Sequence, residues 1–441
     1  MPKAKRAATG TKYQYPGIED IKTPFWYMGH KNPTINLPQK TIKEGFLMLN
    51  TNSTEYLLGL KDVIVDKIED IDKEKHIYLH MHQRIHLCPN CGHPTSKVHD
   101  YRTQTIGDLP AAGMNIILHL RKRRHVCAMC GKRFDEYNDF VQRYGRFTNR
   151  VFLKIVEELA EARSIKSIAK AHRMSSPTAA KVLDYINYEP TKLPEVLSID
   201  EFKGDADGER FQCILTDAKK HEIFDILPTR KQEDLLAYFG KFPNQNDVKY
   251  VITDMNLNFK STLKLRFPNA TVVIDKYHYM RQVDFALEAV RKQEQKRLSD
   301  VWRLYFKRSR SLLIKQSNKI TWEDQLQLDN MFRYSSALHD AYNLKVSFES
   351  FKKSTTRDEA ARRLGDWAMF AQATGLQPFI NVTQTFARWQ TEILNSFDVP
   401  YTNGYTEGCN NRIKVIKRVA FGMPKFKRFR RRILHIMKPE V

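Results

Sequence analysis

Three acidic residues stand where their carboxylates could converge on divalent metal ions. Asp200 and Asp254 each close a short apolar run of strand-like character, and Glu407 lies in a polar segment with helical periodicity. In two-metal phosphodiester cleavage, one ion activates the attacking water or hydroxyl and the other stabilises the leaving oxygen. Magnesium prefers oxygen ligands and keeps several waters, so two or three carboxylates are enough. The sequence therefore predicts a catalytic Mg²⁺ or Mn²⁺ site at Asp200, Asp254 and Glu407.

Other acids compete for the same role. Aspartate at the end of a strand is often only a turn residue or a helix cap, and the chain has 50 acidic residues. Asp275 closes another apolar run and is a rival to Asp254, while Glu201 lies beside Asp200. His278 follows Asp275 closely and has no role that its position reveals. Spacing alone leaves the choice of acids open.

The cysteines give a second metal signal. Four of the six form two C-x-x-C pairs, each followed by a glycine, at Cys88, Cys91, Cys127 and Cys130. Two such knuckles supply the four thiolates of a closed, structural zinc tetrahedron. Buried free thiols are the alternative, but they would not explain the pairing. The strand-like segment Met114–Arg123 would join the knuckles; His93, His99 and His125 lie nearby, and we leave them out of the zinc site.

The charge balance indicates a polyanionic partner. Lysine and arginine total 73 against 50 acidic residues, a formal net charge of +23, and ten basic residues without an acid lie between Arg412 and Arg432. Phosphate contacts supply most nonspecific affinity for nucleic acid. Solvated basic faces are the alternative. The residues expected at DNA are Arg121, Arg123, Arg124, Thr178, Lys181, Lys414, Arg418, Lys425, Lys427 and Arg428.

A tri-helical segment follows the cysteines. Apolar residues recur at helical spacing between Val151 and Leu159. Ser164 can cap a helix over Ile165–Arg173. Ser176 can cap the next helix, with Pro177 in its first turn, and this helix would turn Ala179, Val182, Leu183 and Ile186 inward. This pattern predicts a helix-turn-helix, although helical hairpins without any nucleic-acid role are common.

The acids require a sheet to position them. Short apolar runs predict strands at Glu195–Asp200, Phe211–Thr216, His221–Leu227, Val248–Thr253 and Ala270–Ile274, with helices at Lys231–Phe239 and Phe259–Phe267. This mixed α/β order resembles a ribonuclease-H-like sheet, in which the first and fourth strands are adjacent. That adjacency would bring Asp200 and Asp254 together. Tyr277 to Asn395 has the composition of a helical block, and a helix at Asn403–Asn411 would present Glu407 on its polar face.

Taken together, these motifs resemble the DDE transposases of bacterial insertion sequences, specifically the ISL-three family. The matching segments, in chain order, are Leu57–Leu60, Cys88–Gly92, Cys127–Phe134, Ser198–Phe202, Asp254–Asn256, Asp275–His278 and Asn403–Asn411. The resemblance implies a catalytic triad of Asp200, Asp254 and Glu407, and it makes the helical block an insertion between the last strand and the Glu407 helix. The first fifty residues depart from the usual start of the family.

The expected fold is therefore α/β, a ribonuclease-H-like catalytic core with a helical insertion, preceded by a zinc ribbon and a helix-turn-helix domain. The divisions we expect are an N-terminal extension (1–50), a zinc ribbon (51–145), a helix-turn-helix (146–190), a catalytic core (191–280 and 396–425), a helical insertion (281–395) and a basic tail (426–441).

The resemblance also implies a function. Such an enzyme binds the terminal inverted repeats of its element as double-stranded DNA, cleaves by metal-dependent hydrolysis and joins the freed 3′-hydroxyl to target DNA, acting as at least a dimer. Without an apolar signal segment or membrane span in the sequence, we expect it in the bacterial cytoplasm at the nucleoid. The alternatives are a noncatalytic zinc-ribbon and helix-turn-helix DNA-binding regulator, and another ribonuclease-H-like nuclease.

Overall fold

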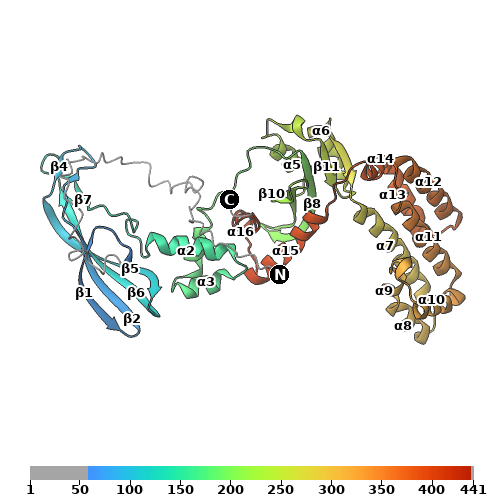
Figure 1. The fold of residues 1–441 in the computed structure, drawn as a ribbon, viewed down its shortest axis with the longest axis horizontal. Coiled ribbons are helices and arrows are strands. Elements are labelled where there is room, and N and C mark those ends of the chain that lie inside the picture. Colours follow the sequence, from blue (N-terminus) through green and yellow to red (C-terminus); the bar gives the residue numbers. More distant parts are fainter. Residues whose placement is uncertain (1–57, 439–441) are drawn as a thin grey trace, which may run out of the picture. The chain divides into compact units, whose positions relative to one another are not determined.

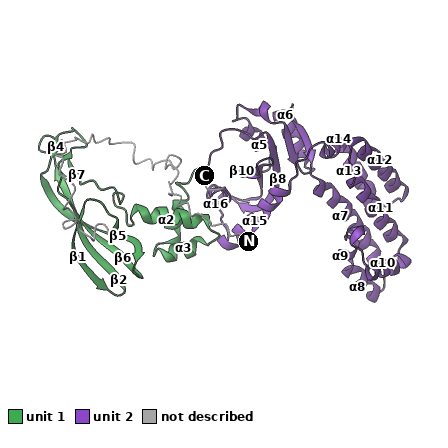
Figure 2. Ribbon diagram, viewed as in Figure 1, with its two compact units in different colours: residues 1–187, 440–441 green, residues 188–439 purple. Residues whose placement is uncertain are grey.

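The structure is a computed structural model that describes residues 58–438 (Figure 1). The chain divides into two compact units, residues 1–187 with 440–441, and residues 188–439 (Figure 2). Each unit is considered separately. The extension predicted over residues 1–50 lies outside the described residues.

The first unit is built on a five-stranded sheet. Its strands are β1 (Val63–Ile71), β2 (Glu74–Met81), β5 (Val98–Ala111), β6 (Met114–Val126) and β7 (Arg133–Asp135). Their order is β1-β2-β6-β5, with β7 paired to β6. The charged stretch between Lys67 and Lys75 belongs mostly to these strands, because the β1–β2 turn is confined to Asp72 and Lys73 at positive φ. Alternating strand residues such as Ile77 and Leu79 form the buried core of this sheet.

Smaller elements complete the unit. Two-residue strands β3 (His86–Leu87) and β4 (Pro94–Thr95) pair around the first cysteine knuckle. Three helices follow the sheet, α2 (Asn149–Ala160), α3 (Ile165–Ala171) and α4 (Ser176–Val182).

The helix starts follow local capping chemistry. The Ser164 side chain accepts a hydrogen bond from the Ser167 amide and begins α3, as predicted. The second cap is Ser175, which accepts from the Thr178 amide, so the predicted cap at Ser176 is wrong by one residue. Ser176 and Pro177 instead occupy the first helical turn, where proline loses no hydrogen bond. The four residues expected to face inward are buried: Ala179, Val182, Leu183 and Ile186.

The second unit contains a mixed five-stranded sheet. Its strands are β8 (Val196–Ala206), β9 (Glu209–Asp217), β10 (Glu222–Leu227), β11 (Tyr250–Thr253) and β12 (Thr271–Ile274), in the order β10-β9-β8-β11-β12. β8, β9 and β10 form an antiparallel meander, while β11 runs parallel to both β8 and β12. The adjacency of the first and fourth strands is therefore as predicted.

Helices cover both faces of this sheet. On one face, α5 (Gln232–Phe239) and α6 (Leu257–Arg266) bury Phe239 and Phe259 against strand residues such as Leu197; a short 3₁₀ helix, η3 (Gln245–Asp247), precedes β11. On the other face, α15 (Gly404–Ala420) and α16 (Phe426–Met437) pack on Phe202, Ile214 and Ile226.

The position of α16 corrects the expected basic tail. The described part of residues 426–441 is a helix whose Phe429, Ile433 and Leu434 lie fully buried in the core of the second unit. Its apolar residues recur at helical spacing between the arginines, so the high charge concealed an amphipathic pattern.

A helical block separates β12 from α15 in sequence. It comprises α7 (Lys276–Gln295), α8 (Asp300–Arg308), α9 (Arg310–Leu313), η4 (Ser317–Lys319), α10 (Trp322–Tyr334), α11 (Ser336–Lys352), α12 (Arg357–Ala373), α13 (Gln377–Arg388), α14 (Gln390–Leu394) and η5 (Asn395–Phe397). These helices share one core in which Phe348, Trp367 and Phe386 contact one another. The helical composition of this segment is thus confirmed.

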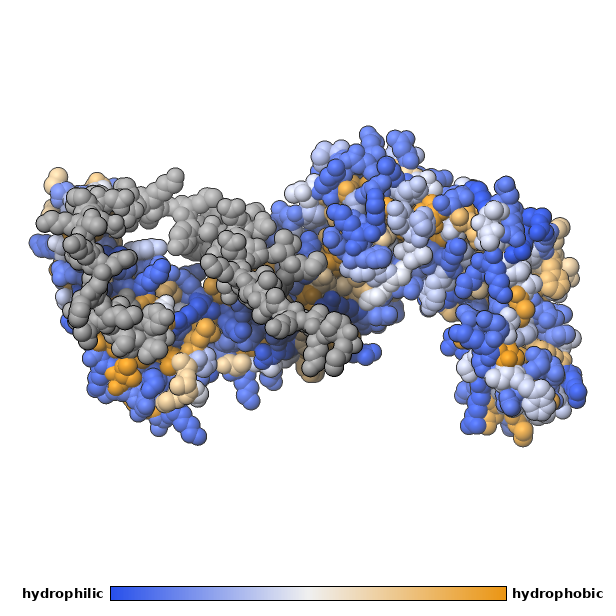
Figure 3. All heavy atoms as spheres, in the orientation of Figure 1, coloured by the Kyte–Doolittle hydropathy of each residue, from blue (hydrophilic) through white to orange (hydrophobic). Residues whose placement is uncertain are grey.

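The face of the molecule drawn in Figure 3 is predominantly polar. Figure 3 shows hydrophilic residues over most of the visible face, with apolar side chains in scattered patches. Among the described residues, no helix is both long and apolar enough to cross a membrane.

Candidate active site and metal centres

Three aspartates line up across neighbouring parallel strands. The register pairs Ile252 with Ser198 and Thr253 with Ile274. Extending the β8–β11 pairing by two residues brings Asp254 level with Asp200. Extending the β11–β12 pairing by one residue brings Asp254 level with Asp275. Asp254 and Asp275 directly follow their strands, as predicted. Asp200 instead lies inside β8, because this strand continues to Ala206 rather than ending at the acid.

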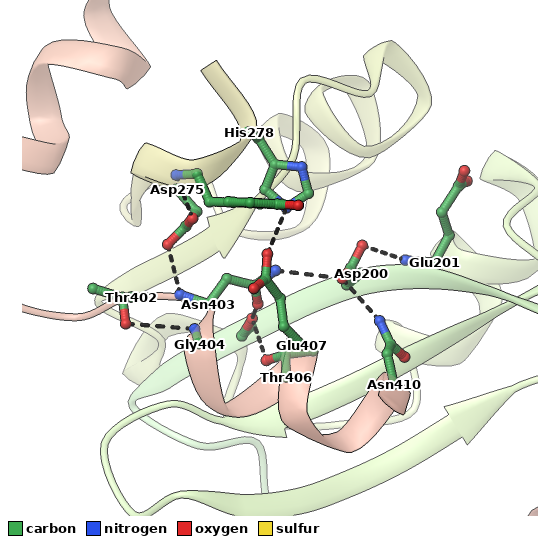
Figure 4. A network of polar contacts seen from close by, with 12 residues as sticks. Asp200, Glu201, Asp275, His278, Thr402, Asn403, Gly404, Thr406, Glu407 and Asn410 are labelled. Atoms are coloured by element: carbon green, nitrogen blue, oxygen red, sulfur yellow. Dashed lines mark hydrogen bonds and ion pairs between the residues drawn. The ribbon is translucent and has the colours of Figure 1, made fainter. Parts of the chain in front are cut away.

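The carboxylate of Asp200 is held by amides from α15. Its Oδ2 atom accepts hydrogen bonds from Asn410 Nδ2 at 2.9 Å and from Asn403 Nδ2 at 3.4 Å, and its Oδ1 atom accepts from the Glu201 amide at 2.7 Å (Figure 4). Ser198 in turn donates to Asn403 Oδ1. Asp200 and Asn403 are both buried. The helix predicted to carry Glu407 therefore also fixes the orientation of the first aspartate.

Burial and mutual repulsion disfavour ionisation of these acids. Desolvation raises the pKa of Asp200 to about 6, and the charges of Glu201 and Glu407 add to the effect. Desolvation also raises the pKa of Asp254 to about 7, with further contributions from Asp200 and Glu201. The pKa of Glu407 is raised by desolvation and then by Asp275. Acids whose ionisation is disfavoured in this way are characteristic of functional sites, since a bound cation would relieve the repulsion.

Glu407 is closest to the rival acid. Asp275, His278 and Glu407 each offer a ligand atom, and these atoms all lie within 4.8 Å of one another. Among residues 58–438, the predicted set of Asp200, Asp254 and Glu407 does not form a cluster that tight. His278 Nε2 lies 3.9 Å from a Glu407 oxygen.

Asp275 also has a structural role. One of its oxygens accepts from the Tyr277 amide and caps α7, and the other accepts from the Asn403 amide at 2.8 Å. It therefore joins the start of the helical block to the start of α15, and both of its oxygens have partners.

The donor set fits divalent cations. Within the described chain, three buried polar atoms at this site have no hydrogen-bond partner: Asp254 Oδ1, His278 Nε2 and Asn410 Oδ1. Such atoms are costly to leave unpaired in a protein interior. Carboxylate and amide oxygens are the ligands that Mg²⁺ and Mn²⁺ prefer, so the residues present suit these ions.

The four paired cysteines converge in the first unit. Cys88 Sγ lies 3.5 Å from Cys130 Sγ, and Cys91 Sγ lies 3.5 Å from Cys127 Sγ. All four sulfurs lie within 4.8 Å of one another. This spacing suits tetrahedral zinc, as the sequence predicted.

The two knuckles have the same backbone. In each, the amide of the following glycine donates to the carbonyl of the first cysteine, at 2.8 Å for Gly92 and 3.0 Å for Gly131. Both glycines have positive φ, which explains the residue type at these two positions.

The basic residues of the first unit differ in their availability. Arg121 is exposed and lies over the Tyr101 ring, and Lys181 is exposed on α4. Thr178 is half-buried and takes part in the Ser175 cap. Arg124 is half-exposed, 3.6 Å from Asp100.

Arg123 is occupied inside the sheet. It donates to the Met81 carbonyl at 2.8 Å and to buried Glu136 at 3.1 Å. We therefore assign it to holding the strands rather than to DNA, which revises its place in the predicted set.

The basic residues of the second unit divide between surface and core. Lys414, Arg418, Lys425 and Lys427 are exposed, and Arg428 is half-buried. In contrast, Arg430 bonds to Asp225, and Arg431 and Arg432 are buried. Lys414, Arg418, Lys425 and Lys427 therefore face solvent, on and just after the helix that carries Glu407.

Comparison with known proteins gives consistent matches. The model of the ISL3-type DDE proteins, described as "Transposase", matches residues 197–433. A second, described as "zinc-finger of transposase IS204/IS1001/IS1096/IS1165", matches residues 84–130. A curated relative, the transposase for insertion sequence element IS1001 from Bordetella parapertussis, is 25% identical over 391 residues, which cover 85% of this chain and 95% of the relative.

Proposed function

The chain belongs to the ISL3, or ISL-three, family of transposases, and from this we propose that it cuts the ends of its own insertion sequence and joins them to target DNA. In this proposal, Asp200, Asp254 and Glu407 hold Mg²⁺ or Mn²⁺. The second unit then has a ribonuclease-H-like core, a reading supported by its strand order and by the two helices on each face of the sheet.

The single observation that carries the proposal is the convergence, from distant segments, of acids whose pKa values are raised. Asp200 and Asp254 lie level on adjacent strands, and α15 brings Glu407 close enough to raise the pKa of Asp200. Asp254 also keeps a buried oxygen without a partner. Arg230 only partly offsets the desolvation that raises the pKa of Asp254, and its own ion pair is with Glu201.

Each residue of the acidic site would have a distinct role in this reaction. Bound Mg²⁺ would supply charge neutralisation and activation of water or a 3′-hydroxyl. Asp200 is oriented for this by Asn403 and Asn410, which donate to one of its oxygens and leave the other near the Glu201 amide. Asp275 positions the first turn of α15 through the Asn403 amide. Desolvation lowers the pKa of His278 and so disfavours its protonation. Its imidazole is therefore suited to accept a hydrogen bond near Glu407.

DNA recognition would be distributed over both units. The zinc ribbon and the α3–α4 pair, a helix-turn-helix in this proposal, would read the terminal repeats, with exposed Arg121 and Lys181 and half-exposed Arg124 as contacts. The exposed cations Lys414 and Arg418 lie on the same helix as Glu407, where they can contact a phosphate backbone near the acids.

Two further proposals follow from the reaction class. Joining two ends requires two active sites, so we propose a homodimer in the DNA complex. The DNA substrate would place the protein in the bacterial cytoplasm at the nucleoid. The competing function is a DNA-binding regulator without catalysis, which would need the zinc ribbon but none of the acids.

The test is Mg²⁺-dependent cleavage of a supercoiled plasmid that carries the ends of the element. The wild type should nick and release the ends, whereas Asp254→Asn and Glu407→Gln should bind them with unchanged affinity and cut at least roughly a thousandfold more slowly. Asp234→Asn, an acid on α5, is the matched control and should cut normally.

Two results would redirect the proposal. A wild type that binds the ends but does not cut in Mg²⁺ or Mn²⁺ would favour the regulator. Cutting that survives both substitutions would show that other acids act, with Asp275 the next to replace.

A further inference from the structure

Two histidines beside the zinc knuckles repeat the same spacing. His86 lies two residues before Cys88, and His125 lies two residues before Cys127. Residues two apart in a strand point to the same side, and β3 and β6 carry these histidines just ahead of their cysteines. Their rings lie side by side, with centroids 4.6 Å apart.

A buried carboxylate completes the group. Glu136 follows β7, which pairs with β6 so that Phe134 stands opposite His125. One ligand atom each from His86, His125 and Glu136 falls within 4.8 Å of the other two. None of the three belongs to the four-cysteine site, so the ribbon holds a second group of ligand-type side chains.

The ring nitrogens of the central histidine, His125, are buried and lack hydrogen-bond partners of good geometry in the described part of the chain. His125 is 0% exposed, and within residues 58–438 neither Nδ1 nor Nε2 makes a hydrogen bond. Leaving a buried polar group unsatisfied costs about 1–3 kcal/mol. The Lys97 carbonyl lies near this imidazole without making a hydrogen bond of good geometry. Metal-bound histidines commonly direct their second nitrogen at such a carbonyl.

We propose that His86, His125 and Glu136 bind a second divalent metal ion, of the borderline class represented by Zn²⁺. Two imidazole nitrogens and one carboxylate oxygen form a set that zinc accepts, with water in the fourth position. Zinc ligands at about 2.0–2.2 Å stand roughly 3.3–3.6 Å from one another, so the three side chains need to close by no more than roughly 1.5 Å.

This site should be weaker than the four-cysteine site. Both Glu136 oxygens already accept hydrogen bonds from Arg123, one from its amide at 2.8 Å and one from its guanidinium at 3.1 Å. Each oxygen keeps a lone pair for a metal, but the arginine charge opposes the ion. A mild chelator should therefore remove this ion first.

The experiment is metal counting on the full-length protein. Protein equilibrated with free Zn²⁺, in excess Mg²⁺ to occupy the acidic site, is desalted and analysed by inductively coupled plasma mass spectrometry. The wild type should retain two zinc ions per chain, and His86→Gln and His125→Gln should retain one. His99→Gln, an exposed histidine of the same sheet, should retain two. One zinc ion in the wild type, or two in both cluster variants, would overturn the proposal.

Cobalt titration keeps the proposal testable if a variant unfolds the ribbon. In the wild type, again with excess Mg²⁺, the first Co²⁺ equivalent should produce thiolate-to-metal charge-transfer absorption from the cysteines. The second Co²⁺ equivalent should add only visible d–d bands. A His125→Gln variant that retains the charge-transfer band should lack these added bands. If that variant loses both signals, the wild-type titration decides, and the absence of a second, thiolate-free equivalent would overturn the site.

Discussion

The four-cysteine site and the acidic site are opposite solutions to holding a metal. The cysteines come from two short knuckles with the same backbone hydrogen bonds, and their sulfurs already stand 3.5 Å apart in pairs. The acids come from β8, β11 and α15, and at least one buried oxygen lacks a partner. A closed tetrahedron stabilises its fold, whereas an open set of carboxylates destabilises it and leaves room for a substrate.

The largest effect expected from this contrast is on folding of the first unit. Cys127→Ser removes one thiolate from a site whose binding free energy supports the ribbon, so zinc retention and resistance to proteolysis of residues 58–187 should be lost. Affinity for the element ends should fall at least roughly a hundredfold, since each factor of ten is only about 1.4 kcal/mol. Cys409→Ala, a buried cysteine outside the ribbon, should preserve both. If Cys127→Ser resisted proteolysis and still bound the element ends, the four-cysteine site would not stabilise the fold as proposed.

The acidic site should show the reverse, a gain in stability when an acid is removed. The folded pKa of Asp254 is about 7, above its ordinary value of 3.8. A raised carboxyl pKa contributes stability that is present at low pH and lost as the pH rises through the folded value. In buffer without Mg²⁺ or Mn²⁺, Asp254→Asn should therefore be more stable than the wild type at about pH 8, by up to a few kcal/mol of unfolding free energy, and by less at about pH 5.5, as thermal denaturation would measure.

Magnesium provides the control for that measurement. It should raise the melting temperature of the wild type at the higher pH, where the acids are ionised, and have little effect on Asp254→Asn. An equal rise in the melting temperature of both proteins would contradict the assignment of Asp254 as a metal ligand.

A smaller effect is expected on the basic face beside Glu407. Lys414→Ala with Arg418→Ala should lower the slope of log affinity against log salt by roughly 0.9 for each lost phosphate contact. Lys307→Ala with Arg308→Ala, two exposed cations of α8, is the matched control and should leave the slope unchanged. Fluorescence anisotropy over a range of salt concentrations measures both. Equal slopes for the two double variants would remove α15 from the DNA interface.

Features determined by neighbouring residues could be predicted from the sequence. The cysteine spacing predicted the cluster, Ser164 predicted a helix cap, and the apolar runs predicted every strand of the second sheet. Errors occurred where a local signal was ambiguous. Asp200 looked like a strand end but lies within β8, and the arginines of α16 concealed a buried face.

The finer geometry of the acidic site could not be predicted, because it depends on distant segments. Asp275 and Glu407 are separated in sequence by the whole helical block, yet Asp275 bonds to the Asn403 amide at the start of α15. The role of Arg123 was hidden for a similar reason, since its partner Glu136 lies just after another strand, β7. The spacing His86-x-Cys88 and His125-x-Cys127 was visible, but only packing shows that Glu136 joins it.

The most direct test of the central claim exchanges the ligand type at Asp254. Mn²⁺ accepts softer ligands than Mg²⁺ does, so Asp254→Cys should cut the element ends in Mn²⁺ but not in Mg²⁺, while the wild type cuts in both. Asp275→Cys, at the rival acid, should show no such metal-dependent rescue. If cutting by Asp275→Cys is rescued by Mn²⁺ and cutting by Asp254→Cys is not, the metal ligand is Asp275 and the proposed triad is wrong.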